Sequence, residues 1–206
     1  MRETRRLWSG LEAFNLASRE LVLAQVDDDP DRRQRVDALL ARTCTVAAGR
    51  VEPWRLRVLN LARAGRADEA LRVLTEGTLL VADPAPLEWV RIGLLREMGR
   101  LDEAEAMARA YLQEHPDDPD MLHDLAVLQG QRGRWRDAAA TAERLKTAAP
   151  ADHRGWLDLG VALARLGRPE AAAATFREGL AHVPEGPARD LLAENLARLD
   201  EAGRRP

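Results

Sequence analysis

The chain has 206 residues, of which 32% are charged and 4% aromatic, and its formal net charge at pH 7 is −3. This near balance of charge gives no bulk attraction to nucleic acid or to a membrane surface, so neither is an expected partner. No stretch approaches the roughly 20 apolar residues that cross a bilayer.

Two helices are predicted before residue 50. The first covers residues 4–26 and has an apolar stripe at helical spacing, made of Leu7, Leu11, Phe14 and Leu21. The second follows a turn at Asp29-Pro30, and its stripe consists of Val36, Leu39, Leu40, Thr43 and Val46.

The same region bears on location. Charged residues such as Glu12 and Arg19 interrupt the first segment, so it lacks the uncharged core of a secretory signal. The single Cys44 permits no intramolecular disulfide and lies on the second stripe, which fits a buried thiol in a reducing compartment. We therefore expect a cytoplasmic protein.

A period of 34 residues runs through the middle of the chain. Gly-Arg recurs at 65, 99, 133 and 167, and an alanine follows each glycine by five residues, at Ala70, Ala104, Ala138 and Ala172. The clearest window, 153–186, carries Trp156, Leu159, Gly160, Leu163, Gly167, Ala172, Phe176, Gly179 and Pro184. This pattern resembles the tetratricopeptide repeat family, and the resemblance covers windows 51–84, 85–118, 119–152 and 153–186. It implies an all-α, right-handed superhelical α-solenoid of antiparallel helix pairs in a bacterial protein.

Local sequence supports a helix pair in each window. In the first window, Trp54, Val58 and Leu61 form one stripe of a helix, and Ala70, Val73, Leu74 and Gly77 face it from the second helix. The glycine before each second helix suits a positive φ, and acidic residues such as Asp68 follow it in the first turn. Pro116, Pro150 and Pro184 are expected to end the second helices.

The second window departs from the pattern. Strict spacing places Glu88 and Arg91 where the signature has large apolar residues, whereas Trp89, Ile92 and Gly93 reproduce the required spacing one residue later. We therefore expect the first helix of this window to be shifted by one residue, with a shorter turn before Gly99.

Both flanks are predicted to be helical caps. Residues 187–206 form a capping helix and tail whose stripe is Ala188, Leu191, Leu192, Asn195, Leu196 and Leu199. Residues 1–50 are predicted to be a helical hairpin that is a degenerate repeat, although this region has no turn glycine.

No catalytic, cofactor or metal site is expected. The histidines, His115, His123, His153 and His182, form no zinc-binding pair. The acidic run from Asp27 to Asp31 lacks the glycine and the glutamate of a calcium loop, so it is interpreted as a turn with N-cap aspartates. Helical repeats serve as scaffolds more often than as enzymes.

The resemblance implies that the first helices line a concave groove that binds a partner protein. Candidate partner-binding residues are Arg55, Leu59, Arg63, Trp89, Arg96, His123, Val127, Arg154, Asp158 and Arg165. An apolar floor with an arginine rim suits an extended peptide or an amphipathic helix with acidic flanks. Two alternatives remain: the arginines are ordinary solvated residues, and Trp89 belongs to the core rather than the groove.

Other roles stay open for the N-terminal helices. Apolar residues around Trp8, Leu11, Phe14 and Leu21 favour self-association, as in a structural subunit or a secretion-type chaperone. A third hypothesis is that the first helix folds back and plugs the groove.

Overall fold

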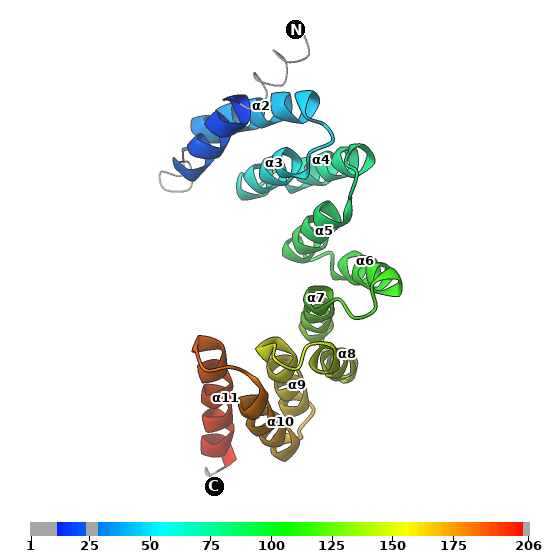
Figure 1. The fold of residues 1–206 in the computed structure, drawn as a ribbon, viewed down its shortest axis with the longest axis vertical. Helices are drawn as coiled ribbons and strands as arrows, with labels where there is room; N and C mark the ends of the chain where they lie inside the picture. Colours follow the sequence, from blue (N-terminus) through cyan, green and yellow to red (C-terminus); the bar gives the residue numbers. More distant parts are fainter. Residues whose placement is uncertain (1–11, 24–28, 204–206) are drawn as a thin grey trace. The chain divides into compact units, whose positions relative to one another are not determined.

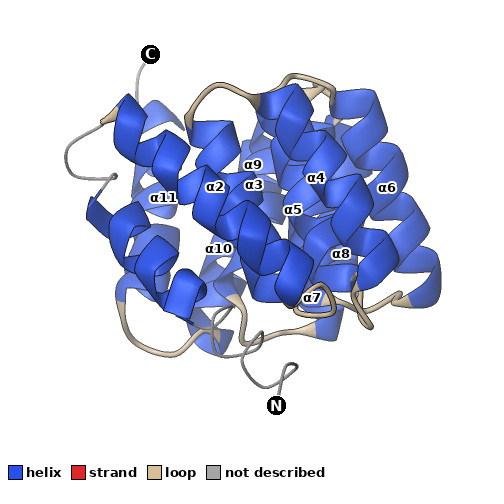
Figure 2. Ribbon diagram, turned by 90° about the horizontal axis from the view of Figure 1, so that it is seen from above, coloured by secondary structure: helices blue, strands red, loops and turns tan. Residues whose placement is uncertain are grey.

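The computed structural model describes residues 12–23 and 29–203, and all regular secondary structure within these ranges is helical (Figure 2). A helix over residues 12–23 comes first. The helices that follow are α2 (Pro30–Val46), α3 (Val51–Arg63), α4 (Ala67–Leu80), α5 (Ala85–Glu97), α6 (Leu101–Glu114), α7 (Pro119–Gln131), α8 (Trp135–Ala148), α9 (His153–Arg165), α10 (Pro169–His182) and α11 (Pro187–Gly203). Within the described ranges, none of them has the length and apolar character needed to cross a membrane.

The chain folds into two compact units, Met1–Arg100 and Leu101–Pro206. In each unit, helices that follow one another in the chain pack side by side as pairs, for example α3 with α4 and α9 with α10 (Figure 1). The all-helical array of helix pairs predicted from the sequence is therefore confirmed.

The helix bounds follow the 34-residue period without a gap. The first helices α3, α5, α7 and α9 each have 13 residues and begin at 51, 85, 119 and 153. The expected one-residue shift of α5 is therefore wrong. Leu87, not Trp89, is the fully buried residue near the start of α5, where it packs against Gly77 of α4. Trp89 is half-buried.

The recurring Gly-Arg pairs form the turns between first and second helices. Gly65, Gly99, Gly133 and Gly167 all have φ between 71° and 73°, as predicted. In each turn the arginine N–H donates to a carbonyl five residues earlier, for example Arg134 N to Gln129 O at 2.9 Å. This is a Schellman motif, which satisfies carbonyls left unpaired at the end of a helix.

The core of the first unit surrounds Trp54. Its ring packs with Val58, Leu61, Leu74 and Leu87, and its indole N–H donates to the Ala48 carbonyl at 2.8 Å. Cys44 belongs to the same cluster and is buried, as the sequence predicted. Burial raises the pKa of the Cys44 thiol to about 12, which disfavours the reactive thiolate.

The second unit repeats this arrangement around Trp156. The Trp156 indole N–H donates to the Pro150 carbonyl at 2.8 Å, and its cluster includes Ala172, Phe176 and Leu192. Gly160 of α9 lies directly against the ring of Phe176, with no room for a Cβ atom. The Leu-Gly element of the repeat signature is thus needed for close approach of α9 and α10.

The flanking helices differ in detail from the predicted stripes. Leu21 is buried together with Ala17 against Val36 and Leu40 of α2, so it is not available for association. Residues Trp8 and Leu11 lie outside the described residues. Asp29 caps α2 by accepting from the Asp31 and Arg32 N–H groups, as the interpretation of the acidic run predicted.

The C-terminal helix α11 packs mainly on α10. Leu192 is fully buried in the Trp156 cluster, and Ala188, Leu196 and Leu199 pack against the same cluster. Leu191 was predicted to share this stripe, but 36% of it is exposed, because the buried stripe passes through Leu192.

Candidate functional site

The candidate residues of the first unit lie mainly on α3. Arg55 is exposed and donates to Glu52, three residues earlier, at 3.0 Å. Leu59 is half-buried, and Arg63 is exposed. The spacing of four residues between each pair places all three on one side of the helix.

Arg63 also lines a hollow of about 630 Å³ between α2 and α3. The hollow is lined by Pro30, Arg33, Gln34, Asp37, Ala38, Asn60, Arg63, Ala64 and Arg66. Asp37 accepts from Arg57 at 2.9 Å and from Arg66 at 3.4 Å, so this carboxylate fastens α2 to the next helix pair. The buried Asn60 donates to the Arg33 carbonyl at 2.9 Å and makes a second link between α2 and α3.

Trp89 and Arg96 lie on α5 and are both half-buried. Their partial burial leaves one surface of each side chain accessible. Trp89 is therefore not part of the buried core, and its place in a groove stays a prediction.

In the second unit, α7 and α9 are joined by polar pairs. His123 Nδ1 lies 2.6 Å from Asp158 Oδ2, and Arg154 Nη2 lies 2.7 Å from Asp120 Oδ1. Arg154 also donates to the Asp152 carboxylate, at 2.6 Å from Nη2 and 3.0 Å from Nε. We call these five residues the α7–α9 polar face.

Hydrogen bonds within the polar face shift the pKa values of three of its residues. The hydrogen bond to Asp158 raises the pKa of His123 against the opposing effect of partial burial. Partial burial favours a higher pKa for Asp152, but the hydrogen bonds from Arg154 outweigh it and lower that pKa. Hydrogen bonds to Asp152 and Asp120 raise the pKa of Arg154. Arg154 is therefore a cation whose charge is already compensated inside the protein.

Two further candidates lie apart from these pairs. Val127 is half-buried on α7. The Arg165 guanidinium lies 5.5 Å from the ring centre of Trp135, at the start of α8, in a cation–π contact. The structure thus brings His123, Arg154 and Asp158 together, whereas Arg165 has a different neighbour.

Sequence reasoning missed that Asp120 and Asp152 neutralise Arg154. A signal for one of these pairs is present in the sequence. Asp120 and Arg154 are 34 residues apart and begin successive first helices with opposite charges. Residues at the same position of successive repeats are neighbours in the stack. Opposite charges at one position therefore predict an ion pair between the two repeats.

Among the described residues, no three histidine, cysteine or acidic side chains lie close enough together to hold a metal ion.

Comparison with known proteins matches two segments of the chain to tetratricopeptide repeat families, residues 85–128 and residues 123–187. The TPR repeat-containing protein PA4667 of Pseudomonas aeruginosa is 35% identical over 105 residues, which are 48% of this chain and 16% of that protein. Cellulose synthase operon protein C of Xanthomonas axonopodis is 30% identical over 86 residues, which are 40% of this chain and 6% of that protein. The chain thus spans a small part of the length of the curated relatives it matches.

Solved structures agree on the fold. MamA from Desulfovibrio magneticus has a TM-score of 0.65 at 14% identity, over 84% of this chain and 94% of that chain. YrrB, described as a TPR protein with an unusual peptide-binding site, has a TM-score of 0.58 at 10% identity, over 85% of this chain and 90% of that chain.

Proposed function

Because the chain belongs to the tetratricopeptide repeat family, we propose that it is an adaptor that binds a peptide or amphipathic helix of a partner protein on its first helices. The fold supports a protein-interaction scaffold in general.

The proposal is carried by one exposed side of α3. Arg55 and Arg63 are exposed on either side of the half-buried Leu59, with one helical turn between neighbours. The only hydrogen bond of Arg55 to a described residue is to Glu52, and both side chains are about half exposed. An exposed pair of this kind contributes little, so a ligand carboxylate can replace Glu52 at small cost. An acidic segment with one apolar residue matches this surface.

The ion pairs of Arg154 within the protein make it less suitable than Arg55 or Arg63 for binding a partner's carboxylate. Arg154 is held by Asp120 and Asp152, and a ligand would have to displace one of them. The charges of Arg55 and Arg63 are therefore more available to a partner than that of Arg154.

Charge reversal on α3 tests the proposal. The full-length protein and an Arg55→Glu, Arg63→Glu variant are used to capture proteins from an extract of the cells that make it. A synthetic peptide from each specific prey is then titrated calorimetrically. We expect at least a tenfold loss of affinity in the variant, because two charge-assisted contacts become repulsive.

The matched control is Arg72→Glu on the second helix α4, which is also exposed. It changes the net charge in the same direction away from the first helices, and it should leave affinity unchanged. Equal affinity of the α3 variant and the wild-type protein would rule out this surface as the binding site.

A second candidate function, self-association, has support from helix 12–23. Leu16, Val22 and Leu23 are 48%, 61% and 39% exposed. Analytical ultracentrifugation over a range of concentrations tests this candidate. A mass that rises with protein concentration would support it, provided that the Leu16→Gln, Val22→Gln variant loses this rise. The control variant Leu79→Gln on α4 should keep the rise. A strict monomer would exclude it.

A further inference from the structure

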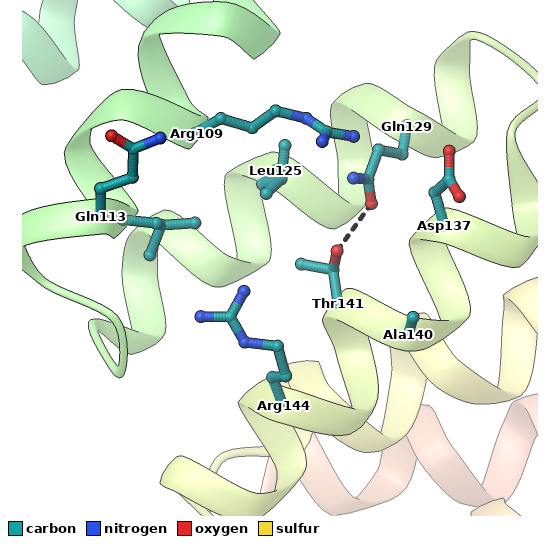
Figure 3. Close-up of a pocket in the computed structure, with 9 residues that line it drawn as sticks. Arg109, Gln113, Leu125, Gln129, Asp137, Ala140, Thr141 and Arg144 are labelled. Carbon is teal, nitrogen blue, oxygen red and sulfur yellow. Dashed lines mark hydrogen bonds between the residues drawn. The ribbon is translucent and has the colours of Figure 1, made fainter.

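A second hollow lies in the second unit, away from the first-helix surfaces described above. It has a volume of about 420 Å³ and opens between α6, α7 and α8 (Figure 3). The lining residues are Arg109, Leu112, Gln113, Leu125, Gln129, Asp137, Ala140, Thr141 and Arg144. We call it the α6–α8 pocket.

Two arginines enter the pocket from different helices. Arg109 comes from α6 and Arg144 from α8, and Figure 3 shows their guanidinium groups on opposite sides of the hollow. Arg109 is held by Glu105, at 2.9 Å from both Nε and Nη2. Arg144 is held through Nη2 by the Pro116 carbonyl at 2.6 Å. Each guanidinium group is therefore held along one edge only. Its remaining N–H groups can donate to another acceptor.

A third donor lies at the back of the pocket. Gln129 is only 2% exposed, and its side-chain oxygen accepts from the Thr141 hydroxyl at 2.8 Å. This bond fixes the orientation of the amide. The amide nitrogen makes no hydrogen bond to another described residue and points into the hollow between the arginines (Figure 3). A ligand acceptor in the hollow can pair with this donor.

The rest of the lining is apolar or already paired. Leu112 and Leu125 are buried and form an apolar wall beside the three donors. The acidic member of the lining, Asp137, lies 3.7 Å from Arg134 outside the pocket, which offsets its charge. The site therefore offers donors and positive charge next to an apolar surface.

We propose that the α6–α8 pocket binds a carboxylate attached to a short apolar group, as in the C-terminal residue of a partner chain. Arg109 and Arg144 clamp the carboxylate from two sides, and the Gln129 amide donates to one of its oxygens. The attached apolar side chain packs on Leu112 and Leu125. The volume lies within the range of small-ligand sites, which suits a single terminal residue.

Nuclear magnetic resonance on the ¹⁵N-labelled full chain tests the site with N-acetyl-leucine as the probe. The amides of Gln129, Thr141 and Arg144 should shift on titration. N-acetyl-leucinamide has the same shape without the charge and should shift them far less. Absence of shifts, or equal shifts with the neutral amide, would overturn the carboxylate site.

Substitutions locate the binding. Arg109→Gln and Arg144→Gln should each weaken the affinity about tenfold, because each removes a hydrogen bond to a charged group. Both arginines are exposed, so the variants should fold, and circular dichroism confirms this. Arg136→Gln is the control, since Arg136 is exposed on α8 but does not line the pocket. Unchanged affinity in both pocket variants would place the binding elsewhere.

Two tetrapeptides that end in leucine, one with a free C-terminus and one amidated, distinguish a partner's C-terminus from a small carboxylic acid as the ligand. Binding of the free peptide alone supports a partner's C-terminus. Binding of N-acetyl-leucine but of neither peptide overturns that source in favour of a small carboxylic acid. The Arg55→Glu, Arg63→Glu variant should bind the probe normally, so failure of this site is distinguishable from failure of the proposed adaptor surface on α3.

Discussion

At the scale of single residues, glycines inside helices differ in the space available for a side-chain methyl group. A Cβ atom at Gly160 would overlap the ring of Phe176, whereas a Cβ atom at Gly93 would meet nothing within 4 Å. Both residues lie inside first helices, α9 and α5. Helix propensity favours alanine at both positions, so the difference between them isolates close packing.

Gly160→Ala is therefore expected to lower the free energy of unfolding by about 2 kcal/mol, the usual cost of overpacking a core. Gly93→Ala should raise it by up to about 1 kcal/mol through helix propensity alone. Urea unfolding followed by circular dichroism measures both. If Gly160→Ala were neutral, α9 and α10 would not depend on close contact at this position.

The hydrogen bond between His123 and Asp158 makes stability depend on pH. Since the folded-state pKa of His123 is raised, the stabilisation is fully present below its unfolded value of about 6.5. It is lost as the pH rises through the folded value. We expect Asp158→Asn to cost more stability at pH 5.5 than at pH 9.

A double-mutant cycle with His123→Gln and Asp158→Asn checks this through melting temperatures at the two pH values. The coupling between the two sites should be favourable at pH 5.5 and should shrink at pH 9. A coupling that does not vary with pH would contradict the protonated-histidine pair.

At the scale of elements, a buried carboxylate fastens α6 to the turn between α7 and α8. Glu105 of α6 has a side chain only 4% exposed and contacts Arg132, Arg134 and Arg109. Asp102, one turn earlier, also contacts Arg132 but is 84% exposed. The two acids share an arginine and differ mainly in burial.

Glu105→Gln is expected to cost about 2 kcal/mol, less than a fully buried pair because the arginines are partly solvated. Asp102→Asn should cost less than about 0.5 kcal/mol, as for other exposed pairs. Urea denaturation at neutral pH compares them. Equal effects would show that burial of Glu105 does not strengthen its ion pairs.

Helices and turns that depend on local sequence patterns could be predicted more fully than side-chain pairings between helices. The helix pairs, the positive-φ glycines and the ends of the second helices could be predicted, because each depends on local patterns repeated every 34 residues. The register of α5 was mispredicted because tryptophan was assumed to take the core place that Leu87 fills. The pairing of Arg154 with Asp120, 34 residues earlier, has a signal in the repeat, whereas its pairing with Asp152 depends on side-chain geometry that periodicity does not encode.

The candidate site was predictable to a smaller extent. The positions on the first helices follow from periodicity, and Arg55 and Arg63 are exposed as their places predicted. Whether an arginine is open to a partner depends on its neighbours in the next repeat. The α6–α8 pocket had no sequence signature, because its three donors come from three separate helices, the second helices α6 and α8 and the first helix α7.

At the scale of the whole molecule, the two compact units each have their own core. In the second unit, the Trp156 cluster and the cluster of Ala126, Ala142 and Leu159 are formed entirely by residues after Leu101. The C-terminal helix α11 contributes Leu192 to the first of these clusters. Repeat arrays gain stability mainly from contacts between neighbouring repeats, and these two clusters supply such contacts within the second unit.

A fragment of residues 101–206 is therefore expected to fold and to melt cooperatively in circular dichroism, since it keeps every buried member of the Trp156 cluster and of the cluster of Ala126, Ala142 and Leu159. The same fragment without α11, residues 101–186, should melt at a markedly lower temperature, because Phe176 and Val183 lose the cover of Leu192 and Leu196. The full chain measured in parallel shows how much the remaining residues contribute. A fragment 101–206 that lacks a cooperative transition would show that stability requires the whole array.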